Sequence, residues 1–341
     1  MLSKLINSLL LFTVLLWSTL LMAAGNSRVV YPDWFKENLY DLEGDLKEAR
    51  DAGKNGIMVF FSMQTCSYCL AILSTAFKEA DIVQRLNQNY DVIGLDVFSD
   101  NELVDIHGKT HWTKEFAVAE KAKFTPTMIF YGVDGTIQLR LVGYQSPEKM
   151  RAVLSYLESD NFKHSSLRQF LEKDKSTTKS ATSKTVNQDL DRRSSSERHL
   201  MVVFESDDCS KCPLLREMLK AGVVQPYLSR LDIAFVSSSD NVSRITTPQG
   251  EQLSGKAWAD QLGLIYNPAM VFFNGKREEV LRVDTDILLN KDGDTIKPDD
   301  EKVLDNIRAR LQFVTDNGYV SLPQFQRWRA QQRNKARQIQ D

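Results

Sequence analysis

The stretch Phe-Phe-Ser-Met-Gln-Thr-Cys-Ser-Tyr-Cys, residues 60–69, is the most informative about the fold of the first half of this chain. It continues an apolar run from Ile57 that predicts a buried strand, and a helical pattern follows Cys69. Cys66 is therefore expected at a helix N-terminus, where unpaired N–H groups and the macrodipole favour a thiolate. Cys69 lies about one turn further on the same face, within reach of a disulfide. The spacing indicates redox chemistry.

The second half of the chain repeats this arrangement. A cysteine pair, a later proline and a hairpin glycine recur at nearly one offset, and an internal duplication is the simplest account. The matched positions are Cys66 and Cys209, Cys69 and Cys212, Pro126 and Pro268, and Gly135 and Gly275.

Each half predicts the element order βαβ, then a helix, then a β-hairpin and a closing helix. In the first half we expect strands at 57–61, 92–97, 128–131 and 137–142, and helices at 46–52, 66–86 (broken near 79–81), 112–121 and 146–158. In the second half we expect strands at 200–204, 232–236, 269–273 and 279–283, and helices at 209–219, 256–262 and 299–315. Trp112 and Trp258 are expected in the cores.

Size and composition fit a globular protein with two domains, and the N-terminal segment predicts export. At 341 residues the chain is too long for one ordinary core, and its four cysteines form only the two Cys-x-x-Cys pairs. The net charge of −2 argues against nucleic acid as a partner. Residues 1–24 predict a signal peptide, with Lys4, an apolar run from Leu5 to Met22 and small residues after it; an uncleaved membrane anchor is the alternative.

The sequence predicts where the domains, the linker and the tail lie. We expect a first domain at 28–160, a Ser/Thr/Lys-rich flexible linker at 173–198, a second domain at 199–320 and a basic helical tail at 321–341. The arginines of the tail, Arg327, Arg329, Arg333 and Arg337, are interpreted as a solvated face.

With these residues the chain resembles the thioredoxin superfamily. The motifs are Cys66-Ser67-Tyr68-Cys69 with Thr125-Pro126, and Cys209-Ser210-Lys211-Cys212 with Asn267-Pro268. The chain is similar to periplasmic tandem thioredoxins associated with sulfur oxidation. The resemblance implies an α/β fold of two tandem thioredoxin domains, each a central mixed sheet flanked by helices. It also implies that Pro126 and Pro268 are cis and that, with Thr125 and Asn267, they bind an extended substrate.

The sequence departs from the family pattern in three ways, which limit the family properties that can be assigned to this chain. Thr65 stands where thioredoxin has Trp before the first cysteine, and the dipeptides inside the two pairs differ, so no redox potential is carried over. Phe60 and Val203 replace the buried acid that lies six residues before that cysteine. Asn267 stands where Thr125 precedes the first proline, so the second groove is expected to differ.

Other interpretations of the cysteines are weaker. A static disulfide across so short a loop gains only about 2 kcal/mol or less. A zinc site is disfavoured because the pairs lie far apart and each opens a helix after a buried strand, and His107 and His111 in a polar loop do not change the expectation of no metal. Leu70 and Pro213 stand where covalent haem would require His.

The expected function is thiol–disulfide exchange on exported, periplasmic proteins, with Cys66, Cys69, Cys209 and Cys212 as catalytic residues. No cofactor is expected beyond the redox-active disulfides Cys66–Cys69 and Cys209–Cys212. By resemblance a reductase recharged by a membrane thiol donor is favoured, and electron relay between the two pairs is a further hypothesis. A non-catalytic binding or chaperone module, or an oxidase or isomerase, remains the alternative.

Overall fold

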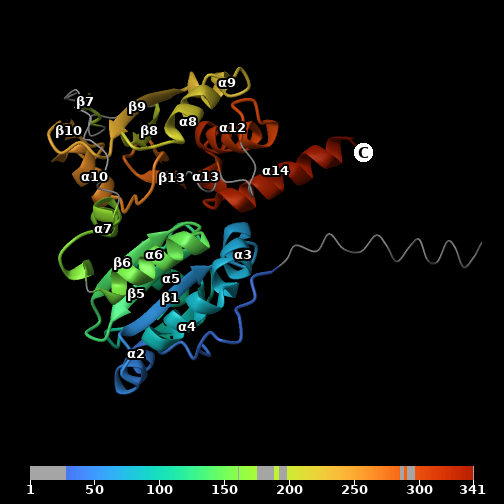
Figure 1. The fold of residues 1–341 in the computed structure, drawn as a ribbon. Helices are drawn as coiled ribbons and strands as arrows, with labels where there is room; N and C mark the ends of the chain where they lie inside the picture. Colours follow the sequence, from blue (N-terminus) through green and yellow to red (C-terminus); the bar gives the residue numbers. More distant parts are fainter. Residues whose placement is uncertain are drawn as a thin grey trace, which may run out of the picture.

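The computed structural model describes residues 28–159, 161–174, 188–191, 198–284, 288–289 and 296–340. Within these ranges the chain forms two α/β units that lie one above the other in Figure 1. The predicted signal peptide or anchor, residues 1–24, lies outside the described residues, as does most of the predicted linker. No helix in the described part of the chain is long and apolar enough to cross a membrane.

The first unit is built on a four-stranded mixed sheet of order β2-β1-β5-β6. Its strands are β1 (Gly56–Ser62), β2 (Tyr90–Asp96), β5 (Thr127–Gly132) and β6 (Ile137–Val142). Strand β1 is parallel to β2 and antiparallel to β5, and β5 is antiparallel to β6. Every residue of β1 is buried, which explains why its sequence is a continuous apolar run and does not alternate.

Helices cover both faces of this sheet. They are α2 (Leu42–Asp51), α3 (Ser67–Ser74), α4 (Ala80–Asn89), α5 (Thr113–Ala119), α6 (Pro147–Glu158) and α7 (Leu167–Asp174). The predicted long helix after Cys66 is broken, as expected, with a 3-10 turn at Ala76–Lys78 between α3 and α4. The Ser146 hydroxyl caps α6 by accepting from the Lys149 N–H at 3.4 Å, with Pro147 in the first position.

Alternate residues of β1 face two separate cores. Met58 and Phe60 pack in a cluster with Ile72, Leu86 and Val153, and therefore under α3, α4 and α6. The opposite residues of β1 pack in a second cluster under α2 and α5. Its members include Ile57, Val59, Phe61, Leu46 and Phe116. The period of two along a strand thus makes β1 the centre of the unit.

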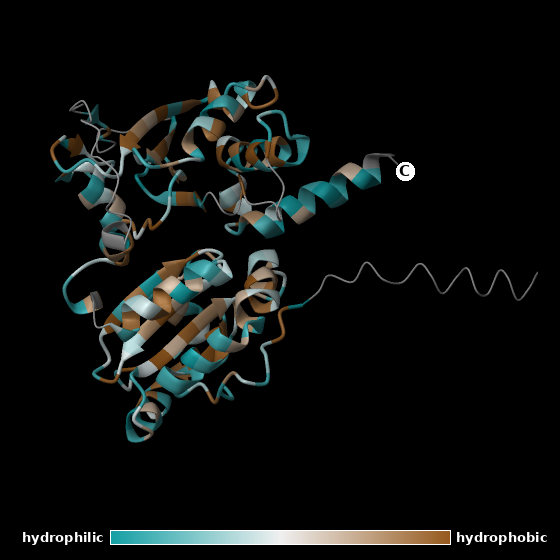
Figure 2. Cartoon of the chain, viewed as in Figure 1, coloured by the Kyte–Doolittle hydropathy of each residue, from teal (hydrophilic) through white to brown (hydrophobic). Residues whose placement is uncertain are grey.

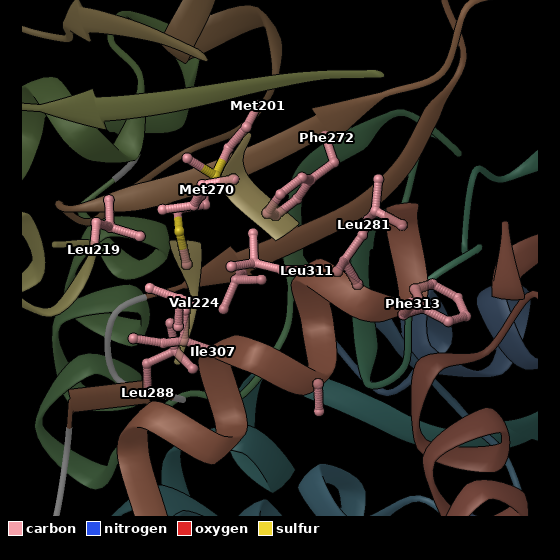
Figure 3. Packing of buried hydrophobic residues seen from close by; sticks show 14 of the residues in the cluster. Met201, Leu219, Val224, Met270, Phe272, Leu281, Leu288, Ile307, Leu311 and Phe313 are labelled. Atoms are coloured by element: carbon pink, nitrogen blue, oxygen red, sulfur yellow. The ribbon is translucent and has the colours of Figure 1, made fainter. Parts of the chain in front are cut away.

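The second unit repeats the plan with a sheet of order β13-β12-β8-β9. Its strands are β8 (His199–Glu205), β9 (Leu231–Ser237), β12 (Ala269–Phe273) and β13 (Glu279–Asp284). Its helices are α8 (Cys212–Met218), α9 (Gln225–Leu228), α10 (Gly255–Gln261), α12 (Glu301–Thr315), α13 (Gly318–Ser321) and α14 (Phe325–Gln340). Figure 3 shows its larger core, in which Met201 and Phe272 of the sheet meet Ile307 and Phe313 of α12. Two α/β units with these sheets bear out the predicted fold class.

Three short strand pairings were not predicted. β3 (Glu102–Val104) and β4 (Thr110–Trp112) form a hairpin inside the polar loop of the first unit. β7 (Gln188–Asp189), which falls in the predicted linker, pairs with β10 (Ile245–Thr246) of the second unit, and β10 also pairs with β11 (Gln252–Leu253). These segments are too short and too polar to show a periodic pattern in the sequence.

Two predictions about side chains are wrong. Trp112 is 44% exposed, because successive side chains of a strand alternate and the neighbouring His111 faces inward in β4. The other tryptophan, Trp258, is buried as expected.

The second wrong prediction concerns the tail. Arg329 is half-buried and donates to Asp305, so it does not belong to a solvated face with Arg333 and Arg337. Figure 2 shows the hydrophobic strands of both sheets and the mainly hydrophilic α14.

Candidate redox-active site

The first cysteine pair lies where β1 passes into α3. Cys66 and Cys69 form a disulfide with a Cα–Cα distance of 5.1 Å. Cys66 is the N-cap of α3, and its Sγ accepts a hydrogen bond from the Cys69 N–H at 3.0 Å. The sequence therefore predicted correctly that Cys66 is at a helix N-terminus, where a thiolate gains from the N–H groups and the macrodipole. Both cysteines are fully buried.

The surroundings of this disulfide are apolar. Cys66 and Cys69 belong to the same buried cluster as Met63, Ile72 and Phe77. Phe60, in place of the family's buried acid, is fully buried, and its ring centroid lies 5.7 Å from that of Phe77. A carboxylate therefore does not occupy this position beneath Cys69.

Tyr31 is a polar group close to this end of β1 that sequence reasoning did not assign to the site. Its hydroxyl makes a 2.7 Å hydrogen bond with the Ser62 hydroxyl, and its ring packs edge-on against Phe60. Burial raises the pKa of Tyr31 to about 12, so that the phenol stays neutral at physiological pH. Tyr31 thus ties the N-terminal segment to the end of β1 through Ser62.

The loop before β5 supplies the predicted substrate-binding residues of the first unit. The Thr125–Pro126 peptide bond is cis, and Thr125 is 9% exposed. Thr125 lines a small cavity together with Tyr68, the third residue of the Cys-x-x-Cys motif. The fold therefore brings the cysteine motif and Thr125 to one place, although they are far apart in the sequence.

The second pair differs from the first in its relation to the helix. Cys209 and Cys212 form a disulfide with a Cα–Cα distance of 5.4 Å, but α8 begins at Cys212 with Lys211 as its N-cap. The prediction that Cys209 opens a helix is therefore wrong: Cys209 lies in the turn before it, so the dipole argument applies less to its sulfur. Cys209 is half-buried and Cys212 is 7% exposed.

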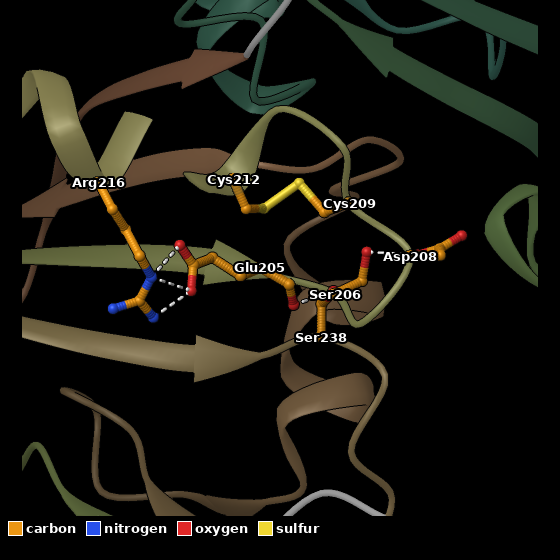
Figure 4. The surroundings of a disulfide bond; sticks show 7 residues. All are labelled: Glu205, Ser206, Asp208, Cys209, Cys212, Arg216 and Ser238. Carbon is orange, nitrogen blue, oxygen red and sulfur yellow. Dashed lines mark hydrogen bonds and ion pairs between the residues drawn. A yellow bond between two sulfur atoms is a disulfide. The ribbon is translucent and has the colours of Figure 1, made fainter. Parts of the chain in front are cut away.

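An ion pair that the sequence analysis missed lies beside the second disulfide (Figure 4). The Arg216 Nε donates to both carboxylate oxygens of Glu205, at 2.9 and 3.0 Å. The Arg216 guanidinium also lies 4.1 Å from the centre of the Phe235 ring. Glu205 ends β8 and Arg216 lies on α8, so the pair holds the strand and the helix that flank the cysteines. The acid directly after the buried strand was the signal available in the sequence.

A groove of about 690 Å³ adjoins the second disulfide. Cys209, Pro213, Arg216, Ile233 and Phe235 are among the residues that line it. Ile233 is 41% exposed on β9, which is an edge strand of the sheet. The Asn267–Pro268 peptide bond is also cis, and Pro268 is buried.

The polar loop of the first unit holds a hydrogen-bonded turn. The His111 Nε2 lies 2.7 Å from an Asp105 carboxylate oxygen, and the other oxygen accepts from the N–H groups of His107 and Lys109. These bonds lower the pKa of Asp105, although its burial opposes the shift. Within the ranges that the structure describes, no three His, Cys, Asp or Glu side chains are grouped to hold a metal ion.

Comparisons with known proteins find a family model and similar solved structures. The family model of the thioredoxin-like domain matches residues 42–158. Among solved structures, a thioredoxin-fold protein from Helicobacter pylori aligns at 16% identity and TM-score 0.34, covering 46% of this chain and 97% of its own. The DsbH oxidoreductase aligns at 15% identity and TM-score 0.28, covering 42% of this chain and 96% of its own.

A third similar structure contains two domains. The first two thioredoxin domains of Saccharomyces cerevisiae Eps1p align at 12% identity and TM-score 0.23, covering 81% of this chain and 98% of their own. No curated protein matches the chain. A thioredoxin-like domain with a Cys-x-x-Cys disulfide at a strand-to-helix turn has the chemistry of a thiol–disulfide oxidoreductase. Residues 42–158 of this chain form a thioredoxin-like domain, as the family model that matches them describes.

Proposed function

We propose that this protein reduces disulfides of exported proteins, and that a membrane thiol donor returns its cysteine pairs to the dithiol form. The observation that carries the proposal is the disulfide Cys66–Cys69 at the N-terminus of α3, in one place with Thr125 of the loop before β5. This arrangement offers a reversible disulfide next to a backbone segment suited to an extended chain.

The mechanism is a pair of thiol–disulfide exchanges. The thiolate of the first cysteine attacks one sulfur of a substrate disulfide and releases the other substrate sulfur as a thiolate. The second cysteine, deprotonated, then attacks the first cysteine's sulfur in the mixed disulfide and releases the second substrate thiol. The substrate gains two electrons and two protons, and the pair becomes a disulfide. Cys66 and Cys209 are the proposed nucleophiles, with Cys69 and Cys212 as resolving residues.

The environment of the first pair supports the direction towards reduction. Strong disulfide oxidants owe their potential to a stabilised reduced form. Apolar burial disfavours a thiolate and opposes the gain from the helix N-terminus. Because Cys66 and Cys69 are buried among apolar side chains such as Met63 and Ile72, we propose that their reduced form lacks this extra stabilisation.

The N-terminal sequence supports the proposal that the protein is exported. Lys4, the apolar run to Met22 and the small residues after it have the pattern of an export signal. In an oxidising compartment a dithiol is maintained only by a dedicated donor, which is the reason for proposing a membrane thiol partner.

The test is the reduction potential of each pair, measured in the full chain. One variant carries Cys66→Ser with Cys69→Ser and the other Cys209→Ser with Cys212→Ser, so each retains a single pair. Each is equilibrated with dithiothreitol buffers and its thiols are trapped with a maleimide. We expect potentials of about −270 mV and catalysed reduction of insulin disulfides. A value of about −120 mV would make the pair an oxidant, and one well below about −300 mV a structural disulfide.

A further inference from the structure

The two disulfides differ in how much of them solvent reaches. Cys66 and Cys69 are both 0% exposed, whereas Cys209 is only half-buried and borders a groove. In Figure 1, α3, which follows Cys66, lies on the side of the first unit that faces the second. Residues of the second unit can therefore contact the cysteine motif of the first.

One such residue is an arginine on α12. The Arg310 Nη2 donates to the Tyr68 hydroxyl at 2.5 Å, and Tyr68 lies between the two cysteines of the first pair. Arg310 is 3% exposed, and its guanidinium lies 4.6 Å from the centre of the Phe325 ring. The contact therefore fixes a residue of the cysteine motif against the closing helix of the other unit.

The loop that carries Thr125 is covered by β13, an edge strand of the second sheet. The Lys123 Nζ donates to the Glu279 carbonyl oxygen at 2.7 Å, and the Arg282 guanidinium lies 5.7 Å from the centre of the Phe124 ring. An edge strand of the protein's own second unit thus lies against the loop that we assign to extended substrates.

The space left beside Tyr68 and Thr125 is small, whereas a larger one of about 1060 Å³ lies further along the interface. Tyr68, Thr125 and Gly143 of the first unit and Asp284 and Phe325 of the second line a cavity of about 70 Å³. A cavity of this size holds a few water molecules and excludes a polypeptide. Thr125 is therefore closed to a protein substrate in this arrangement.

An ion pair between the two units lies at the edge of the interface. The Lys149 Nζ lies 3.7 Å from an Asp284 carboxylate oxygen and 3.1 Å from the centre of the Tyr266 ring. The side chains of Lys149 and Asp284 are 12% and 20% exposed. Ile265, next to Tyr266, packs against the cluster that contains Cys66. The loop before β12 in the second unit is thus part of the same interface.

We propose that the second domain is an intramolecular cap on the redox site of the first, so that partner proteins exchange first with Cys209–Cys212. This inference rests on the proposed function and adds the order in which the two disulfides react.

A partner dithiol attacks the Cys209 sulfur, Cys212 leaves as a thiolate, and the partner's second thiol then releases Cys209. The partner becomes a disulfide, and the pair gains two electrons and two protons. Cys66–Cys69 reacts after the domains separate, so a relay between the pairs requires that opening.

The experiment measures how fast each disulfide is reduced in the full oxidised chain. The probe is dithiothreitol, with alkylation at timed intervals and mass spectrometry of the cysteine peptides. We expect Cys209–Cys212 to be reduced about tenfold faster than Cys66–Cys69. Reduction of Cys66–Cys69 is slowed because the two domains are separated in only a small fraction of the molecules.

The variant Lys149→Glu tests the cap directly. It places a carboxylate opposite Asp284, and a glutamate at the third position of α6 suits the Ser146 cap, so the helix is retained. We expect the rate at Cys66–Cys69 to rise about fivefold or more, with the rate at Cys209–Cys212 unchanged. Adding Asp284→Lys restores an opposite-charge pair and should reverse the increase. Lys47→Glu, an exposed lysine on α2, is the control for the same charge change.

Two results would overturn the cap. One is equal reduction rates at the two disulfides in the unmodified chain. The other is a slow Cys66–Cys69 rate that stays unchanged in Lys149→Glu, because an intrinsic difference between the pairs would survive the variant. Insulin reduction is measured separately, so failure of the proposed function appears there and leaves the order of reactivity to be read from the alkylation data.

Discussion

Single residues in this protein take their properties from the unit that buries them. His199, the first residue of β8, is half-buried, and its Nε2 lies 2.8 Å from the Tyr319 hydroxyl. Burial is the main cause that lowers the pKa of His199 below 6.5, and the Arg230 charge acts in the same direction. Charging this imidazole in the folded state is therefore unfavourable.

The consequence is a pH dependence of stability. Because the folded-state pKa is the lower one, the unfolded chain binds the proton more readily below pH 6.5. The contribution of His199 is complete above that pH and is lost as the pH falls towards the folded-state pKa. We expect the second domain to unfold at lower urea concentration at about pH 5.5 than at about pH 7.5, and His199→Gln to reduce this difference. An equal difference in the variant would assign it to other groups.

At the scale of elements, capping residues set where the helices begin. The Asp300 carboxylate accepts from the N–H groups of Lys302 and Val303, at 3.0 and 3.1 Å, at the start of α12. α12 carries Ile307, Leu311 and Phe313 into the larger core of the second domain, and it also carries Arg310 to Tyr68. The cap at the N-terminus of α12 therefore supports a helix that contributes to both a core and the domain interface.

Removing this cap should weaken α12. Asp300→Ala is expected to lower the free energy of unfolding of the second domain by about 1 kcal/mol, because two N–H groups lose their acceptor. Asp299→Ala, at an exposed neighbouring position, serves as the control and is expected to change it by less than about 0.5 kcal/mol. The measurement is chemical denaturation of the full chain, and equal effects of the two variants would contradict the capping role.

At the scale of the whole molecule, the two domains have separate cores. The clusters around β1 consist of residues of the first domain, with Ile265 as the partly buried contact from the second. The clusters around β8 consist of residues of the second domain and the helices that follow it. Separate cores imply that the two domains unfold as two cooperative units.

This separation predicts two thermal transitions that respond to different variants. Phe60→Ala should lower the stability of the first domain by about 3–5 kcal/mol, because Phe60 is fully buried among aromatic rings. Val203→Ala, at the matching position of the second domain, should lower the other transition. Calorimetry of the full chain checks this, and a single transition that moves in both variants would show that the domains unfold as one unit.

Features that depend on local patterns could be predicted from the amino-acid sequence. The buried strands, the Cys-x-x-Cys turns, the cap at Ser146 and the repeat of the first unit in the second follow from apolar runs, spacing and capping chemistry, which act within a few residues. The resemblance to thioredoxin, and no local pattern, identifies Phe60 as the residue that replaces the family's buried acid. The local patterns predicted a helix start at Cys209, but a short turn before α8 is not distinguishable by periodicity alone.

The accessibility of each disulfide depends on the tertiary structure. Cys66 and Cys209 stand in similar sequence contexts, yet one is fully buried and the other borders a groove. Arg310, β13 and the loop before α14 lie far from Cys66 in the sequence, yet they contact Tyr68 and the loop of Thr125 across the interface. Burial at a domain interface is set by contacts between distant segments, and no periodicity or spacing in a single sequence records them.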